Sequence, residues 1–181
     1  MDDWTTPGLT PEVAKRMADQ VPLSQAAGRI HALADKNPGS GFAAVSLDTP
    51  NRAIIVRWKG SVPADVAAEV ERDRALGIGV TVVEARYSVK ESLAEAGRLV
   101  RAVMGVQAAN GDTITTIGPN KEFSGLTVTL APTAEEKQAV LALSSEALTA
   151  RARAGFPALT SDMPIAITVG SPVDWFVVLP D

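Results

Sequence analysis

The sequence predicts an α+β protein made of duplicated β-β-α-β units, with two small sheets that are each covered by helices on one face and an N-terminal helical arm. The first copy shows strand-like runs, a helix start and a further strand, in the order Phe42 to Leu47, Ala53 to Trp58, Pro63 and Val80 to Glu84. The same signals return in the second copy at Thr113 to Ile117, Gly125 to Leu130, Ala134 and Ile165 to Val169. This repetition predicts a duplicated fold and not a solenoid, because stacked arrays need about three or more repeats.

The spacing of the two copies supports the duplication. Their hairpins begin 71 residues apart, at positions 42 and 113, and their helices begin 71 residues apart, at positions 63 and 134. The final strands begin 85 residues apart, at positions 80 and 165. A longer second helix and a loop from Phe156 to Asp162 account for the addition.

Period-two alternation predicts one buried face and one open face for each sheet. In the first copy Ile54, Val56 and Trp58 share one face, and Ile55 and Arg57 share the other. In the second copy Leu126, Val128 and Leu130 share one face, and Thr127 and Thr129 share the other. We expect the threonines on the open face.

Capping signals indicate where the helices begin and end. Thr10-Pro11-Glu12 begins the helical arm, which we expect Pro22 to interrupt. Ser88 and Glu91 form a capping box for an amphipathic connector that ends at Gly105, and a second box at Thr133 begins a helix that runs to about Ala154. The expected domains are an arm (1–40), the first unit (41–87), the connecting helix (88–105), the second unit (106–170) and an apolar C-terminal tail (171–181).

Composition excludes several classes of function. The chain has 181 residues, 46% of them hydrophobic, and its net charge of -4 is spread along the chain without a basic block. Nucleic acid is therefore not an expected partner, and no run approaches the roughly 20 apolar residues that span a bilayer. The first residues show no signal-peptide pattern, which favours the cytoplasm for the chain as written, whereas a chain trimmed of a leader would be secreted.

No catalytic constellation is visible, so we expect neither an enzyme nor a cofactor. The single histidine, His31, has no nucleophile or acid at a motif spacing and is expected on a solvated helix surface. The absence of cysteine excludes disulfides and thiolate sites, and leaves only carboxylates for a metal. Glu69, Glu71 and Asp73 alternate with arginines and are expected on a solvated helix face. No phosphate-binding glycine loop is present.

The C-terminal tail ends with the apolar run Trp175, Phe176, Val177, Val178 and Leu179. One interpretation is a further strand that docks on the body of the protein. The other is a segment that adds to, or inserts into, a partner. We select Trp175, Phe176, Val177 and Val178, together with Thr127 and Thr129, as candidate partner-binding residues, although a plain solvated face also explains the threonines.

A further pattern lies in the short segments Gly8 to Glu12, Gly41 to Val45, Asp48, Ile54 to Val56, Tyr87-Ser88 and Gly125 to Thr129. These segments resemble the N-terminal proregion of secreted bacterial serine proteases of the alpha-lytic protease and streptogrisin type, or a stand-alone actinobacterial relative. The resemblance implies a two-lobed α/β foldase and inhibitor whose C-terminal lobe lends a sheet to a protease hairpin and whose tail lies in the active site. The sequence as given contains no protease domain, so we expect binding without the folding role.

The expected function is therefore non-catalytic binding of another protein, such as a protease, by a sheet edge and the tail. An alternative is an accessory protein that binds a small molecule or peptide in the cleft between lobes.

Overall fold

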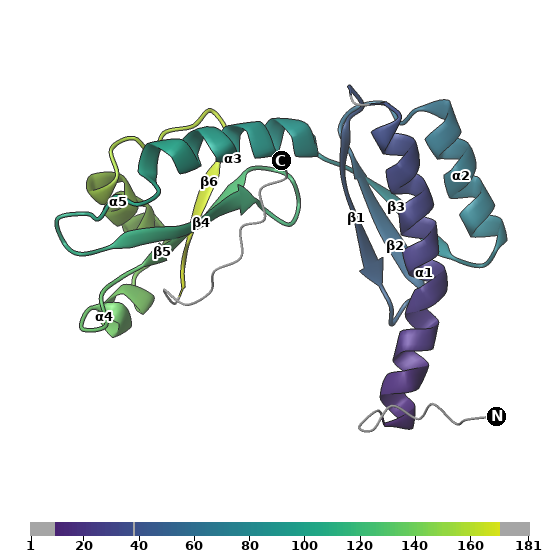
Figure 1. The fold of residues 1–181 in the computed structure, drawn as a ribbon, viewed down its shortest axis with the longest axis horizontal. Helices are drawn as coiled ribbons and strands as arrows, with labels where there is room; N and C mark the ends of the chain where they lie inside the picture. Colours follow the sequence, from purple (N-terminus) through teal and green to yellow (C-terminus); the bar gives the residue numbers. More distant parts are fainter. Residues whose placement is uncertain (1–9, 38, 171–181) are drawn as a thin grey trace. The chain divides into compact units, whose positions relative to one another are not determined.

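The computed structural model describes residues 10–37 and 39–170 and divides the chain into two compact units, residues 1–85 and 86–181 (Figure 1). The elements of the first unit are, in order, α1 (Pro11–Asp35), β1 (Phe42–Asp48), β2 (Ala53–Trp58), α2 (Ala64–Ala75) and β3 (Gly79–Glu84). Those of the second unit are α3 (Val89–Val103), β4 (Thr113–Pro119), β5 (Leu126–Ala131), α4 (Lys137–Leu141), α5 (Ser145–Gly155) and β6 (Ile165–Val169).

The predicted α+β class and the duplication are confirmed by the strand pairing. The sheets have the orders β1-β2-β3 and β4-β5-β6, and in each the first pair is antiparallel and the second pair is parallel. The first strand of each sheet carries a bulge, at Ala43 and at Thr115. α1 and α2 cover one face of the first sheet, and α3 and α5 cover one face of the second (Figure 1).

The helix predicted as a connector has the same role in its unit as α1 has in the first. α3 packs against β4, as α1 packs against β1. Its capping box is present, with the Ser88 hydroxyl accepting from the Glu91 backbone N–H and the Glu91 carboxylate accepting from the Ser88 backbone N–H. The buried face carries Ala96, Leu99 and Val103, whereas Leu93 is 51% exposed.

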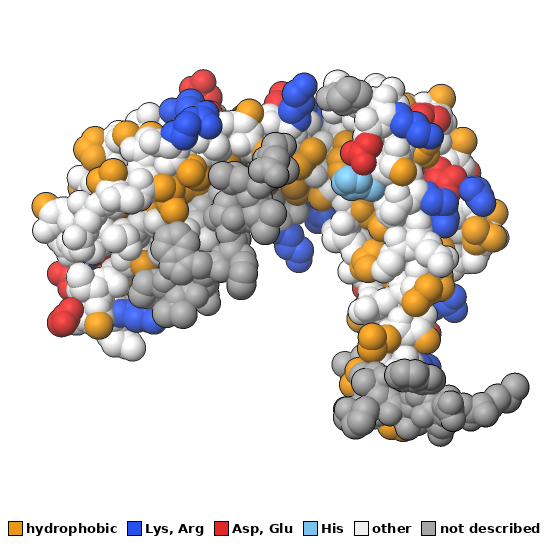
Figure 2. All heavy atoms as spheres, viewed as in Figure 1, with side chains coloured by type: hydrophobic (Ala, Val, Ile, Leu, Met, Phe, Trp, Pro, Cys, Tyr) orange, Lys and Arg blue, Asp and Glu red, His pale blue; other side chains and the backbone are white. Residues whose placement is uncertain are grey.

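The prediction that Pro22 interrupts the first helix is wrong. One continuous helix, α1, contains Pro22. An internal proline removes one hydrogen bond and costs about 3 kcal/mol. The turns that follow it bury Leu23, Ala26, Ile30 and Ala34, and this burial offsets the loss. Before the proline, Val13, Met17 and Val21 are exposed, and apolar side chains line this part of α1 in Figure 2.

The prediction of a single long helix after Thr133 is also wrong, because the structure contains two short helices there. α4 ends at Leu141, and the Ser144 hydroxyl caps α5 by accepting from the Ala147 backbone N–H at 3.2 Å. Serine at an N-cap starts a new helix and competes with continuation of the previous one. Ala152 of α5 then packs with Leu126, Val128 and Leu130 in the core of the second unit.

A glycine substitution tests the close approach of β1 to the end of β2. A Cβ at Gly41 would collide with the backbone carbonyl of Lys59, whose N–H donates to the Gly41 carbonyl at 2.6 Å. We expect Gly41→Ala to destabilise the protein by about 2 kcal/mol in urea unfolding followed by circular dichroism. The matched control is Gly28→Ala in α1, where a Cβ meets no atom within 4 Å and stability should rise by roughly 0.5–1 kcal/mol. Equal effects of the two variants would contradict the assigned close approach.

Candidate functional site

A row of threonine side chains crosses the face of the second sheet that is opposite to its core. The Thr116 hydroxyl donates to the Thr129 hydroxyl at 2.6 Å, and Thr129 and Thr168 hydroxyls lie 3.3 Å apart. Thr127 lies in the neighbouring row, in register with Gly118 and Ala166. The predicted placement of Thr127 and Thr129 on one face is confirmed, and both are half-buried.

The free edge of β6 lies beside this threonine face. The Pro164 carbonyl accepts from the Leu126 N–H at 2.8 Å, and the Gly170 N–H donates to the Leu130 carbonyl at 3.0 Å. Even-numbered residues therefore direct their backbone groups toward β5. Because successive residues of a strand alternate, Ile165, Ile167 and Val169 direct theirs away from the sheet. In the part of the chain that the structure describes, no helix, loop or strand pairs with these groups.

This edge and its face carry no charge. The strand reads Ile-Ala-Ile-Thr-Val, and the open face beside it presents only threonine, alanine and glycine. The corresponding edge in the first unit differs. There the Arg74 guanidinium donates to the Val80 carbonyl at 2.8 and 3.2 Å, and the strand ends with Glu84. Charges at a strand edge block pairing with another chain, so β6 is the more receptive of the two edges.

A clamp from α3 holds the loop that precedes β6. The Arg98 guanidinium donates to the Glu95 carboxylate at 2.6 and 2.9 Å and reaches the Thr160 carbonyl. The hydrogen bonds from Arg98, then that from Ser161, lower the pKa of Glu95 from its ordinary 4.5 to about 2, although burial acts in the opposite direction. This arrangement fixes the start of the free edge.

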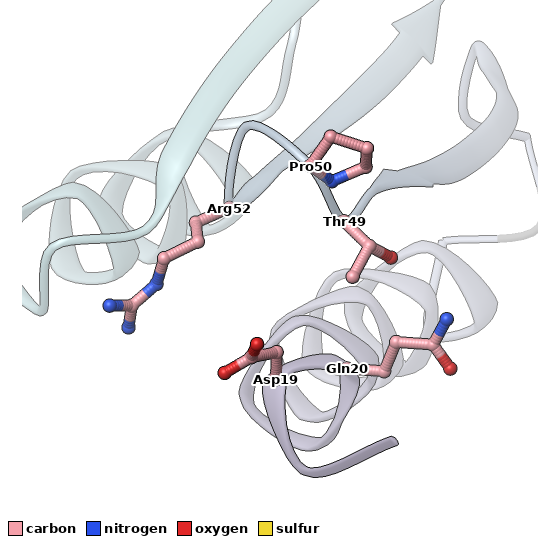
Figure 3. A pocket seen from close by; sticks show the side chains of 5 residues that line it. All are labelled: Asp19, Gln20, Thr49, Pro50 and Arg52. Carbon is pink, nitrogen blue, oxygen red and sulfur yellow. The ribbon is translucent and has the colours of Figure 1, made fainter. Parts of the chain in front are cut away.

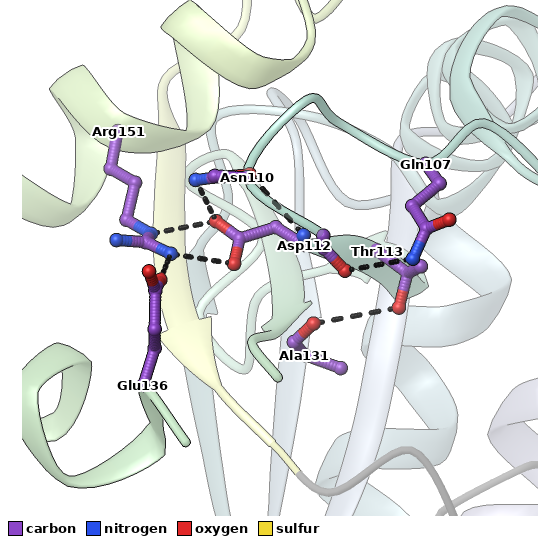
Figure 4. A network of polar contacts seen from close by, with 8 residues as sticks. Gln107, Asn110, Asp112, Thr113, Ala131, Glu136 and Arg151 are labelled. Atoms are coloured by element: carbon purple, nitrogen blue, oxygen red, sulfur yellow. Dashed lines mark hydrogen bonds and ion pairs between the residues drawn. The ribbon is translucent and has the colours of Figure 1, made fainter. Parts of the chain in front are cut away.

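A second polar network joins β4 to α4 and α5 (Figure 4). The Arg151 guanidinium donates to both oxygens of Asp112, at 2.6 and 2.7 Å, and to the Glu136 carboxylate. Asp112 is 1% exposed and also accepts from the Asn110 side chain at 3.0 Å. The hydrogen bonds that Arg151 donates to Asp112, and then to Glu136, raise the pKa of Arg151. Since its charges satisfy one another, this network is a structural fastening.

The acidic residues of α2 were predicted on a solvated face, and for two of them this is wrong. Asp73 is fully buried, and the Glu69 side chain is 12% exposed. Both carboxylates accept hydrogen bonds from Arg29 of α1. Burial acts to raise the pKa of Glu69, but the bonds and charges of Arg29 and Arg72 outweigh it and lower the pKa. Glu71 is exposed and pairs with Arg74 at 2.6 Å.

His31 lies on the exposed surface of α1, as expected. Its side chain is 60% exposed, its Nδ1 lies 3.1 Å from the Asp35 carboxylate, and its ring meets Phe42 edge to face at 5.2 Å between centroids. No serine or threonine nucleophile is bonded to it among the described residues. Within residues 10–37 and 39–170, no three His, Asp or Glu side chains gather in a way that suits a metal ion.

A shallow hollow of about 670 Å³ lies between α1 and the β1–β2 loop (Figure 3). Asp19 and Gln20 reach it from the helix, and Thr49, Pro50 and Arg52 reach it from the loop. Arg52 has a positive φ of 49°, a conformation that non-glycine residues seldom adopt. The hollow thus offers a carboxylate and a guanidinium from opposite walls.

The four predicted tail residues, Trp175, Phe176, Val177 and Val178, lie outside the described residues. The free edge of β6 was not selected from the sequence. The signal that could have found it is the absence of any charge from Ile165 to Val169, but edge position depends on strand order.

No described helix is long and apolar enough to cross a membrane.

No family model matches the chain, and no curated protein matches it. A solved structure described as "Crystal structure of APE1850" is similar at 16% identity and a TM-score of 0.24, over 80% of this chain and 96% of that chain. At this TM-score the likeness carries no argument.

The Glu95 clamp predicts a specific pH dependence. Because the pKa of Glu95 is lower in the folded protein than its ordinary 4.5, its contribution to stability is complete above pH 4.5 and is lost as the pH falls toward 2. We expect Glu95→Gln to be less stable than the wild type at pH 7. Between pH 4.5 and pH 2 its free energy of unfolding should fall less than that of the wild type. Urea unfolding at a series of pH values measures this effect.

The control for the clamp is Glu135→Gln, which changes an exposed glutamate that makes no hydrogen bond in the described structure. Its stability should follow the wild-type pH profile. A Glu95→Gln profile parallel to the wild type from pH 5 to pH 2 would refute the clamp.

Proposed function

We propose that the protein is a non-catalytic interaction module that binds another protein by accepting one of its extended segments at the free edge of β6. The observation that carries the proposal is the uncharged edge next to the threonine face, with which no described residue pairs. Strand addition uses main-chain hydrogen bonds for affinity and side-chain contacts for selectivity. Ile165, Ile167 and Val169 supply the main-chain groups, and Thr127, Thr129, Ala166 and Thr168 supply the face.

The interactions within the second unit favour a preformed docking edge. The Glu95–Arg98 clamp fixes the loop before β6, and the threonine row links β6 to β5. A rigid edge loses little conformational entropy on binding, so more of the hydrogen-bond energy is retained as affinity.

The resemblance to protease proregions supports a secreted bacterial serine protease as the partner. In those proregions the C-terminal lobe lends its sheet to a protease hairpin, and the second unit has the same place in this chain. Under this proposal Trp175, Phe176, Val177 and Val178 provide a further contact with the protease. The proposal includes binding and inhibition, and it does not include a folding role.

The hollow of the first unit supports a second candidate function, the binding of a small molecule or peptide. Asp19 and Arg52 have no ion-pair partner in the described structure, so a ligand with both an ammonium and a carboxylate group would complement both. A thermal-shift screen with amino acids and dipeptides distinguishes this function, because a ligand of the hollow raises the melting temperature without any partner protein.

A lysine substitution tests the β6 edge. Ala166 is exposed on the open face beside the edge, and Thr81 has the equivalent place in the first unit. We expect the full chain to inhibit alpha-lytic protease or a streptogrisin saturably. Ala166→Lys should weaken inhibition by at least about tenfold, or about 1.4 kcal/mol, and Thr127→Lys should act in the same direction. The measurements are inhibition of peptide hydrolysis and calorimetric titration.

The matched control is Thr81→Lys, which should change the inhibition constant less than about twofold because it adds the same charge to the other sheet. Ala166→Lys and Thr81→Lys should retain the wild-type melting temperature, since Ala166 and Thr81 are both exposed. If neither protease binds in the calorimeter, or if Ala166→Lys and Thr81→Lys weaken binding equally, the proposal is wrong.

A further inference from the structure

Arg57 of β2 is a buried cation that pairs with no carboxylate of the described residues. The residue is 8% exposed, and its Nη1 donates to the Ser46 hydroxyl of β1 at 2.9 Å. Its Nε is buried and has no hydrogen-bond partner in the described structure. A buried charge that is neither paired nor fully hydrogen-bonded is costly. The site is therefore incomplete by at least one acceptor.

The position of Arg57 on the sheet explains why the helices do not supply that acceptor. Ile54, Val56 and Trp58 are at most 1% exposed and form the face that α1 and α2 cover. Because side chains alternate along a strand, Arg57 belongs to the opposite face. In register with Arg57 are Ala44 on β1 and Val83 on β3, and neither can accept a hydrogen bond from it through its side chain.

The carboxylate of β1 is already engaged. Asp48 shares the face of Ser46, two positions further along the strand, but it accepts from the Asn51 side chain at 2.9 and 3.1 Å. These bonds close the hairpin turn. Arg57 has no ion pair with Asp48 or with any other described carboxylate.

The other partly buried arginines show what Arg57 lacks. Arg29 is paired with Glu69 and Asp73, and Arg151 is paired with Asp112 and Glu136. Each therefore has two acidic partners from other elements of its own unit. Among the described residues the Arg57 guanidinium has one neutral partner, the Ser46 hydroxyl, although only 8% of the residue is exposed.

We propose that Arg57 and Ser46 form a binding site for an acidic side chain of a polypeptide that docks on the open face of the first sheet. A guanidinium offers several N–H donors in a planar fork that suits a carboxylate. Ser46 accepts from Arg57, so its own hydroxyl proton can be donated to the same anion. Thr81 and Val83, both exposed on this face of β3, give the docking chain an uncharged flank.

This site is separate from the β6 edge, so its test does not depend on the proposed function. The probe is the blocked peptide acetyl-Val-Thr-Glu-Thr-Val-amide, titrated into the ¹⁵N-labelled full chain. The readout is the Nε–Hε resonance of Arg57. We expect a saturable shift of this resonance, together with shifts of the Ser46 and Thr81 amides.

The matched peptide with Gln in place of Glu should shift the Arg57 resonance at least several-fold less at the same concentration. Arg57→Lys should weaken binding of the acidic peptide, and Arg57→Met should abolish it. Equal shifts from the two peptides, saturation by sodium sulfate but not by the acidic peptide, or an unmoved Arg57 resonance would overturn the assignment.

Thermal unfolding of the peptide-free protein gives an independent arm. Arg57→Met should keep or raise the melting temperature, because it removes an uncompensated cation. Arg29→Met is the control and should lower it, because it leaves the buried Asp73 without its partner. If Arg57→Met lowers the melting temperature as much as Arg29→Met does, Arg57 is satisfied internally and the proposal is wrong.

Discussion

The parallel pairing of the last two strands in each unit determines what the rest of the fold can do. Two parallel neighbours cannot be joined by a tight turn, so the chain must cross over the sheet, and here it crosses as α2 between β2 and β3 and as α4 and α5 between β5 and β6. The helix that precedes each hairpin packs within the same unit. With only three strands in each sheet, α1 and α2 in the first unit, and α3 and α5 in the second, bury one face of their own sheet.

Several charged residues form ion pairs that join the secondary-structure elements within each unit. Arg29 joins α1 to α2 through Glu69 and Asp73, and Arg151 joins α5 to the start of β4 through Asp112. These ion pairs are buried or half-buried, and in the described structure one oxygen of Asp73, Oδ2, has no hydrogen-bond partner. The open face of the second sheet is instead uncharged, with hydroxyls that bond to one another across three strands. Such a surface is suited to contact with backbone and small side chains.

The sequence predicts the repeated architecture because its signals are local. Alternation of Ile54, Val56 and Trp58 identifies the core face of β2, and Ser88 with Glu91 identifies the start of α3. The threonine face follows from the same period. Local signals mislead where tertiary contacts decide: Pro22 remains inside α1 because the next turns bury their apolar residues, and α4 ends before Ser144 because this residue caps a new helix.

Long-range partners explain the remaining differences. Glu69 and Asp73 look solvated in sequence because the arginine that neutralises them lies 40 and 44 residues away. The edge position of β6 and the missing partner of Arg57 both depend on strand order, and no spacing of residue types encodes that order directly.

Amide hydrogen exchange along β6, followed by NMR in the free protein, tests the free edge most directly. The N–H groups of Ala166, Thr168 and Gly170 face β5 and should exchange slowly, whereas those of Ile165, Ile167 and Val169 should exchange at rates close to those of an unprotected chain. Slow exchange at all six positions would show that the edge is already paired and would contradict the account.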